Sequence, residues 1–249
     1  MRIISITILL VMALATSLNA QTKNKISENQ VWLAYMNQTR LSNKWGFWAE
    51  AQLRTKEDFF SNFSTAIARV GLTYYLNDNT KITAGYGYVH HFSTGGNQRI
   101  DVPEHRPWQQ IQWHTKYGGN LRVMQYARLE QRYRRKLENP DKLPDGYHFN
   151  WRARYSFLLQ GPIGAKPYEP GTFSWILNDE IHINFGEQIV NNYFDQNRFF
   201  AGFAFHTTKS DQLHFGYMNQ FIQLPAGNSY RTNHIARVAY FHNLDLRKK

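Results

Sequence analysis

From about Val31 onward, apolar and polar side chains alternate along this chain with a period of two residues. The clearest segment is Trp45–Arg54, in which apolar residues hold the odd positions while Glu50 and Arg54 fall on the even ones. Segment 147–157 repeats this arrangement, with aromatic residues opposed by arginines. Because successive side chains of a β-strand point to opposite faces, the pattern predicts strands with one apolar and one charged face.

Two kinds of fold use such strands. A soluble β-sandwich buries the aromatic face, whereas a transmembrane β-barrel turns it toward lipid and encloses the charges in its lumen. The N-terminus favours the barrel. Met1-Arg2 is basic, Ile3–Ala15 is apolar but too short to span a membrane, and Ser17–Ala20 is suited to cleavage. Residues 1–20 therefore read as a secretory signal peptide, which leaves 21–249 as a single barrel domain.

The composition agrees with a half-apolar barrel. Aromatic residues make up 16% of the chain, although the mean hydropathy is only -0.57. The chain has no cysteine, so disulfides and thiolate metal sites are excluded. The net charge of +11 could indicate a nucleic-acid partner. We predict no such partner, because the arginines follow strand faces instead of forming one exposed cluster and because the chain is predicted to be exported.

Eleven segments carry the strand pattern, and the connections between them alternate mostly between short and long. Segment 161–171 is the exception, since it is long where a short turn is due. Bacterial single-chain barrels have even strand numbers, so we expect an all-β, antiparallel, up-and-down transmembrane β-barrel of about 12 strands, or alternatively 10. The eleven segments are 30–39, 44–54, 63–76, 81–92, 105–117, 120–135, 147–160, 173–185, 196–206, 212–223 and 231–244.

Arginine identifies the face that points into the lumen. An arginine facing lipid at mid-depth would cost about 2–4 kcal/mol, so the strand faces that carry arginine are assigned to the interior. This assignment predicts fourteen lumen-lining residues, which are Glu50, Arg54, Arg69, Arg122, Arg128, Glu130, Arg132, Arg134, Arg152, Arg154, Glu180, His182, Arg198 and Arg237.

Two interpretations of these charges remain open. A barrel of 10–12 strands is narrow, so arginines paired with Glu130 and Glu180 could form an ion-pair ladder that fills the lumen. The excess of arginine over glutamate could instead make a basic constriction that favours anions.

Catalysis and metal binding have weaker support. Glu180 and His182 share a face, but without a third ligand they predict no metal site and no cofactor. His91 and Ser93 are two residues apart, as a nucleophile and its base on one strand would be. Their face is predicted to be luminal, however, whereas lipid hydrolysis needs the lipid side, so we do not expect an enzyme.

Several short motifs resemble the DUF2490 family of outer-membrane β-barrel proteins, whose function is unknown. The resemblance extends from about Gln30 to Leu246 and implies a barrel and an outer-membrane location, but no activity. The motifs are Arg106-Pro-Trp-Gln-Gln110, Arg128-Leu-Glu-Gln-Arg132, Trp151-Arg-Ala-Arg-Tyr155, Asn178-Asp-Glu-Ile181, Phe194-Asp-Gln-Asn-Arg198 and His242-Asn-Leu-Asp-Leu246.

These expectations define three hypotheses on function. The first is a barrel with a narrow basic lumen, either a plugged structural protein or a small anion-preferring pore. The second is a lipid- or lipopolysaccharide-modifying enzyme using His91 and Ser93. The third is a docking barrel for another envelope protein. In each case the expected partners are outer-membrane lipid and lipopolysaccharide and the barrel assembly machinery.

Overall fold

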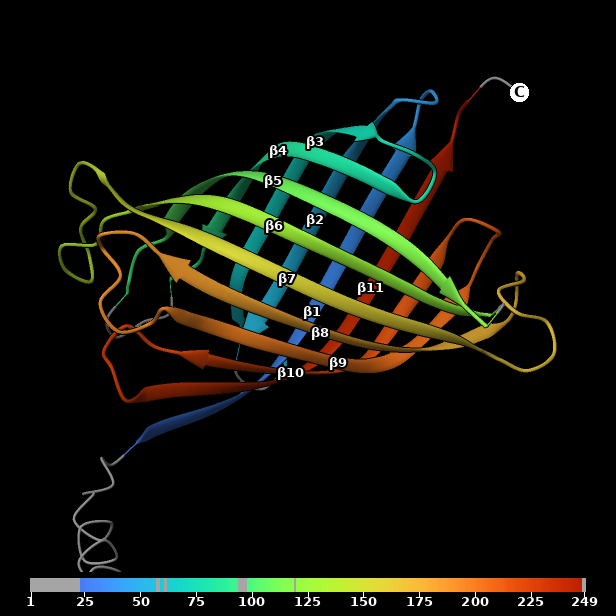
Figure 1. Ribbon diagram of the computed structural model, residues 1–249. Helices are drawn as coiled ribbons and strands as arrows, with labels where there is room; N and C mark the ends of the chain where they lie inside the picture. The colour runs from blue at the N-terminus through green and yellow to red at the C-terminus, as the bar shows by residue number, and fades with distance from the viewer. Residues whose placement is uncertain (1–22, 57–58, 61, 94–97, 119, 248–249) are drawn as a thin grey trace, which may run out of the picture.

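A computed structural model describes residues 23–56, 59–60, 62–93, 98–118 and 120–247, and the predicted signal peptide lies outside these ranges. The described residues form eleven strands that close into one β-barrel (Figure 1). None of them forms a helix long and apolar enough to cross a membrane. The strands are β1 Asn24–Arg40, β2 Trp45–Lys56, β3 Asn62–Tyr75, β4 Thr80–His91, β5 Val102–Tyr117, β6 Leu121–Arg135, β7 Tyr147–Ile163, β8 Phe173–Phe185, β9 Phe194–His206, β10 Gln212–Gln223 and β11 Ser229–Asp245.

The barrel closes through a parallel pair of strands. Consecutive strands pair antiparallel from β1 to β11, and β1 then pairs with β11 in parallel, from Asn24 opposite Ser229 to Arg40 opposite Asp245. The all-β barrel class is thus confirmed, and the eleven segments found in the sequence correspond to the eleven described strands. The expected even number does not apply, because a parallel closing pair lets an odd number of strands form a complete ring.

The two ends of the barrel differ in their connections. Connections of three to five residues join β1 to β2, β3 to β4, β5 to β6 and β9 to β10, and these lie at the end where β11 finishes. Connections of five to eleven residues, and the start of β1, lie at the opposite end (Figure 1). We call these the turn end and the loop end. The β7–β8 connection, residues 164–172, is the long exception at the turn end, as the sequence predicts.

The apolar face of the strands points outward. Trp45 and Phe47 on β2 are 47% and 39% exposed, whereas Glu50 on the same strand is 5% exposed. Phe199 and Phe203 on β9 are likewise exposed. In the part of the chain that the structure describes, the middle outward positions of the strands carry no lysine or arginine. The outer surface is therefore an apolar band that several polar side chains interrupt.

Several outward polar side chains bond to one another across neighbouring strands. Gln131 on β6 donates to Gln109 on β5 at 2.9 Å, and Tyr155 on β7 donates to Gln125 at 2.5 Å. The acidic residue Asp179 on β8 accepts a 2.9 Å hydrogen bond from Asn197 on β9. These pairings reduce the number of polar groups that an apolar solvent would leave unsatisfied.

A large aromatic side chain fills part of the interior beside two glycines. Trp108 on β5 is fully buried, and it lies beside the paired residues Gly85 on β4 and Gly71 on β3. A Cβ at Gly85 would lie 2.9 Å from the Trp108 ring and 2.2 Å from the Val70 carbonyl oxygen. The guanidinium of Arg128 covers the ring at 4.4 Å. Glycine is needed here because the indole and the neighbouring backbone occupy the space of a side chain.

We therefore expect Gly85→Val to reduce the amount of folded barrel strongly, because the new side chain must displace both Trp108 and backbone. The measurement is the fraction of refolded protein whose gel mobility in SDS changes on boiling. Ala84→Val, on the outward face of the same strand, is the matched control and should fold like the native protein. Equal folding of the two variants would contradict this account of the packing.

Candidate functional site: an arginine-rich lumen

The interior of the barrel contains a cavity of about 700 Å³. Its lining includes Gln98 and Leu224 at the loop end and Gln212 and Asn243 at the turn end. The cavity therefore follows the barrel from one end to the other. Of the fourteen residues predicted from the sequence, twelve line it directly, and the other two, Glu130 and His182, are fully buried in its wall.

Arginine dominates the charge of this cavity. Among the described residues, twelve arginines line it, but only two carboxylates, Glu50 and Glu180, do so. Three further carboxylates, Glu104, Glu130 and Asp195, are buried beside the arginines. The twelve arginines are Arg54, Arg69, Arg106, Arg122, Arg128, Arg132, Arg134, Arg152, Arg154, Arg198, Arg231 and Arg237.

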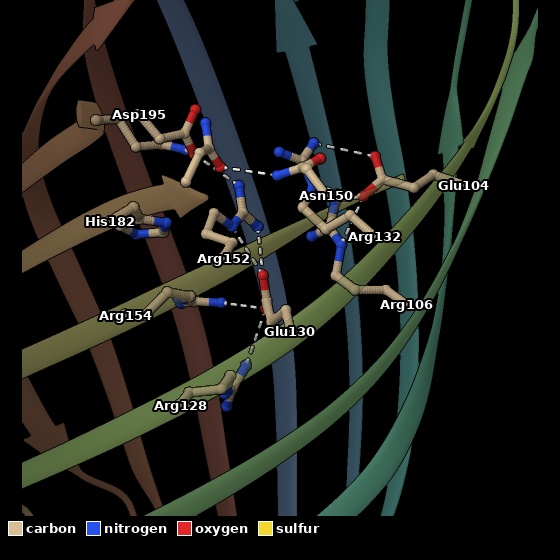
Figure 2. A network of polar contacts seen from close by, with 12 residues as sticks. Glu104, Arg106, Arg128, Glu130, Arg132, Asn150, Arg152, Arg154, His182 and Asp195 are labelled. Atoms are coloured by element: carbon tan, nitrogen blue, oxygen red, sulfur yellow. Dashed lines mark hydrogen bonds and ion pairs between the residues drawn. The ribbon is translucent and has the colours of Figure 1, made fainter. Parts of the chain in front are cut away.

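Glu130 on β6 is the centre of an ion-pair network (Figure 2). Its carboxylate accepts hydrogen bonds from Arg152 at 2.5 and 2.9 Å and from Arg154 at 2.8 Å, both on β7. Arg128 and the more distant Arg69 each approach it to 3.9 Å. Four cations thus converge on one fully buried carboxylate, which offsets part of the cost of removing them from water.

The network continues around the barrel wall. Arg152 also reaches Asp195 on β9 at 2.9 Å, as Figure 2 shows. Arg154 donates to Glu180 on β8 at 2.9 Å, and Arg198 on β9 lies 3.6 Å from the same carboxylate. The ion pairs therefore connect four consecutive strands, β6 to β9, through side chains on their inner faces.

A second branch joins β2 and β3 to this network. Arg69 on β3 bonds to Glu50 on β2 and also extends toward Glu130, which lies three strands away. Its aliphatic stem lies over Gly87 on β4, where an added Cβ would be 3.0 Å from the stem. The absence of a side chain at Gly87 thus gives Arg69 a path across the inner surface.

Glu104 on β5 forms a separate cluster nearer the loop end. It accepts hydrogen bonds from Arg106 at 2.6 and 2.9 Å and from Arg132 at 2.7 and 3.2 Å. Nε2 of His91 on β4 lies 3.0 Å from Oε2 of the same carboxylate. Two arginines and an imidazole therefore surround this fully buried carboxylate.

Glu104, Arg106 and Asp195 are absent from the sequence-based set. Glu104 and Arg106 could have been found, because they alternate with Trp108 on one face of β5. Asp195 could not have been found from the alternation of the strand. It is three residues from Arg198, so strict alternation would place it on the other face, pointing outward. The pairing of β8 with β9 shifts register between His182 and Ile183, and this irregularity turns Asp195 inward beside Gln196.

His91 and Ser93 do not form a catalytic pair in this structure. His91 faces the cavity and contacts Glu104, whereas Ser93 lies beyond the end of β4. The backbone N–H of Ser93 donates to Asp101 at 2.7 Å, and this bond, with the His90 ring at 2.8 Å, holds the pKa of Asp101 below its usual value. No described contact joins His91 to Ser93.

Metal binding gains no support from the geometry. His182 lies 3.1 Å from Glu180, but no third acidic or histidine side chain joins them in a metal-ligating cluster within the described ranges.

A closed β-barrel with an ion-paired, arginine-lined lumen is the class that the fold and the site define. The chain belongs to the DUF2490 family, since the model of this family, a protein of unknown function, matches residues 29–231. The family resemblance seen in the sequence is thereby confirmed. Neither the curated proteins nor the solved structures include a match to this chain.

We expect Glu130→Gln to destabilise the barrel by about 3–5 kcal/mol, because it leaves buried arginines without their shared counter-charge. The measurement is the midpoint of urea unfolding of the refolded protein. Glu138→Gln is the matched control. Its carboxylate pairs with Lys142 at 2.9 Å on an exposed loop, so its loss should change the stability by less than about 1 kcal/mol. Unchanged stability of Glu130→Gln would contradict the central role of this carboxylate.

Proposed function

We propose that this protein is an outer-membrane β-barrel whose basic lumen admits small anions. Its location in a membrane is supported by the outward band of aromatic and aliphatic side chains, which has no mid-strand arginine or lysine among the described residues. The signal peptide predicted for residues 1–20 would deliver the chain to the periplasm. There the barrel assembly machinery would insert it among lipid and lipopolysaccharide.

The preference for anions is carried by one observation, the excess of twelve arginines over the five carboxylates that line the cavity or lie buried beside it. Four of these arginines, Arg54, Arg122, Arg134 and Arg237, have no carboxylate within 4.0 Å among the described ion pairs. Uncompensated cations lower the energy of an anion in a confined space and raise that of a cation.

A plugged structural barrel is the second candidate. The reach of Arg69 from Glu50 toward Glu130 favours it, because this side chain extends over the inner wall and narrows the lumen. The two candidates differ in one measurable property, which is whether ions pass. A docking role for another envelope protein would instead be indicated by a stoichiometric partner that co-purifies with the barrel.

We expect the protein to fractionate with the outer membrane and to shift its mobility in SDS gels on boiling. A closed barrel leaves no strand edge unpaired, so SDS unfolds it only on heating. The measurement is gel mobility of envelope fractions with and without boiling. A periplasmic protein without this shift would contradict the membrane location and would favour a soluble ligand-binding β-fold.

In planar bilayers bathed in a potassium chloride gradient, we expect a reversal potential that indicates selectivity for chloride. Arg237→Gln should reduce this selectivity, because it removes a lumen charge that has no carboxylate partner. Arg99→Gln is the control, since Arg99 pairs with Asp141 on the exposed loops at 2.9 Å. Selectivity for potassium would contradict the proposal, and heat-modifiable protein that carries no current would favour the plugged barrel.

A further inference from the structure

Three arginines gather at two aromatic rings in a corner of the cavity, which is formed by Trp32 on the closing strand β1 and Phe200 on β9. Trp32 on β1 stands between Arg237 on β11 and Arg54 on β2 in the strand register. The guanidinium carbon of Arg54 lies 3.7 Å from the centre of the Trp32 ring, and that of Arg198 lies 5.1 Å from it. Arg237 covers the neighbouring Phe200 at 5.1 Å.

These three arginines are poorly neutralised compared with those of the Glu130 network. The hydrogen bonds described for Arg54 reach only Gln52, at 2.7 Å, and its buried Nε has no partner. Arg237 contacts the Phe200 ring and forms no hydrogen bond or close ion pair within the described residues. Arg198 donates to Gln196 at 3.0 Å and lies 3.6 Å from Glu180. The corner therefore holds more positive charge, and more free donors, than its own carboxylates satisfy.

The same corner is apolar on its other side. Trp32 and Phe200 belong to an interior cluster with Ile176, Met218 and Ile235, and Leu158 packs against it. Trp32, Phe200, Ile176, Met218 and Leu158 all line the cavity. In the strand register Phe200 lies level with Met218 and Ile235, and Ile176 lies level with Arg237, so apolar side chains and arginines adjoin one another on this wall.

We infer that this corner binds an amphipathic carboxylate with an unbranched acyl chain of medium length. The carboxylate accepts hydrogen bonds from Arg54, Arg198 and Arg237, and the chain lies against Ile176, Met218 and the rings. The cavity volume of about 700 Å³ is within the usual range of small-molecule sites. This assignment deepens the anion preference proposed above by naming the anion class, but it requires binding only and not conduction.

Octanoate is the probe. Titration calorimetry of the refolded barrel in non-ionic detergent, with empty micelles subtracted, should show saturable binding of one octanoate per barrel. Acetate lacks the chain and octanol lacks the charge, so both should bind at least about tenfold more weakly. Across a series from butanoate to octanoate, the affinity should rise by about fourfold per methylene.

Variants distinguish contacts to the carboxylate of octanoate from contacts to its acyl chain. Arg54→Gln should weaken octanoate binding by about tenfold or more, because a charge-assisted hydrogen bond is lost. Met218→Gln should flatten the chain-length dependence. Arg99→Gln, on the exposed loops, should bind octanoate like the native protein. Arg54 contacts no carboxylate, so its variant is expected to fold, and heat modifiability checks each protein before titration.

Equal affinities for octanol and octanoate, or native affinity in Arg54→Gln, would overturn this inference. Its failure can be told apart from failure of the proposed function. A barrel that is selective for chloride but does not bind octanoate overturns only the carboxylate site. A barrel that binds octanoate without conducting overturns only the proposed passage of anions.

Discussion

The parallel hydrogen-bond ladder between β1 and β11 is the interaction on which the remainder of the structure depends. It pairs seventeen residues of each strand and converts an open meander into a ring. An open sheet would expose two strand edges, which lipid cannot satisfy and which other chains can pair with. Closure also creates the interior, since only a ring gives the inner face a space of its own. The network around Glu130, the arginines at Trp32 and the apolar wall beside them all require this closure.

Two factors determine where the large side chains of the interior lie, namely charge balance and the space left by glycines. Buried arginines are tolerated where a carboxylate satisfies them, as at Glu130 and Glu104. Glycines beneath Trp108 and Arg69 provide the room for these large side chains to lie flat on the wall. Arg54 on β2 and Arg237 on β11 follow neither rule, because they rest on aromatic rings and pair with no carboxylate among the described residues. That contrast is the physical basis for proposing a ligand-binding site beside Trp32.

The strands and their faces could be predicted because alternation is a local property. Trp45, Glu50 and Arg54 reveal their opposite faces within a single segment. The closing pair could not be predicted, since the partner of β1 lies some two hundred residues away and nothing local marks its direction. The inward position of Asp195 could not be predicted, because it results from an irregular strand pairing. The contact of Arg69 with Glu130 could not be predicted either, because it depends on a glycine in the neighbouring strand. Face assignments therefore follow from sequence, whereas contacts that cross strands require the register.

An odd number of strands has a consequence for biogenesis. The first residue of β1, Asn24, and the last residue of β11, Asp245, lie at opposite rims of the barrel. A surrounding bilayer would separate the two rims, so an epitope tag preceding β1 and one following β11 would be accessible to antibody from different compartments. Even-stranded barrels return both termini to the side from which they were inserted. In the membrane location proposed above, this chain would instead have to move one terminus through the bilayer, or through its own lumen, before the final pair of strands could close.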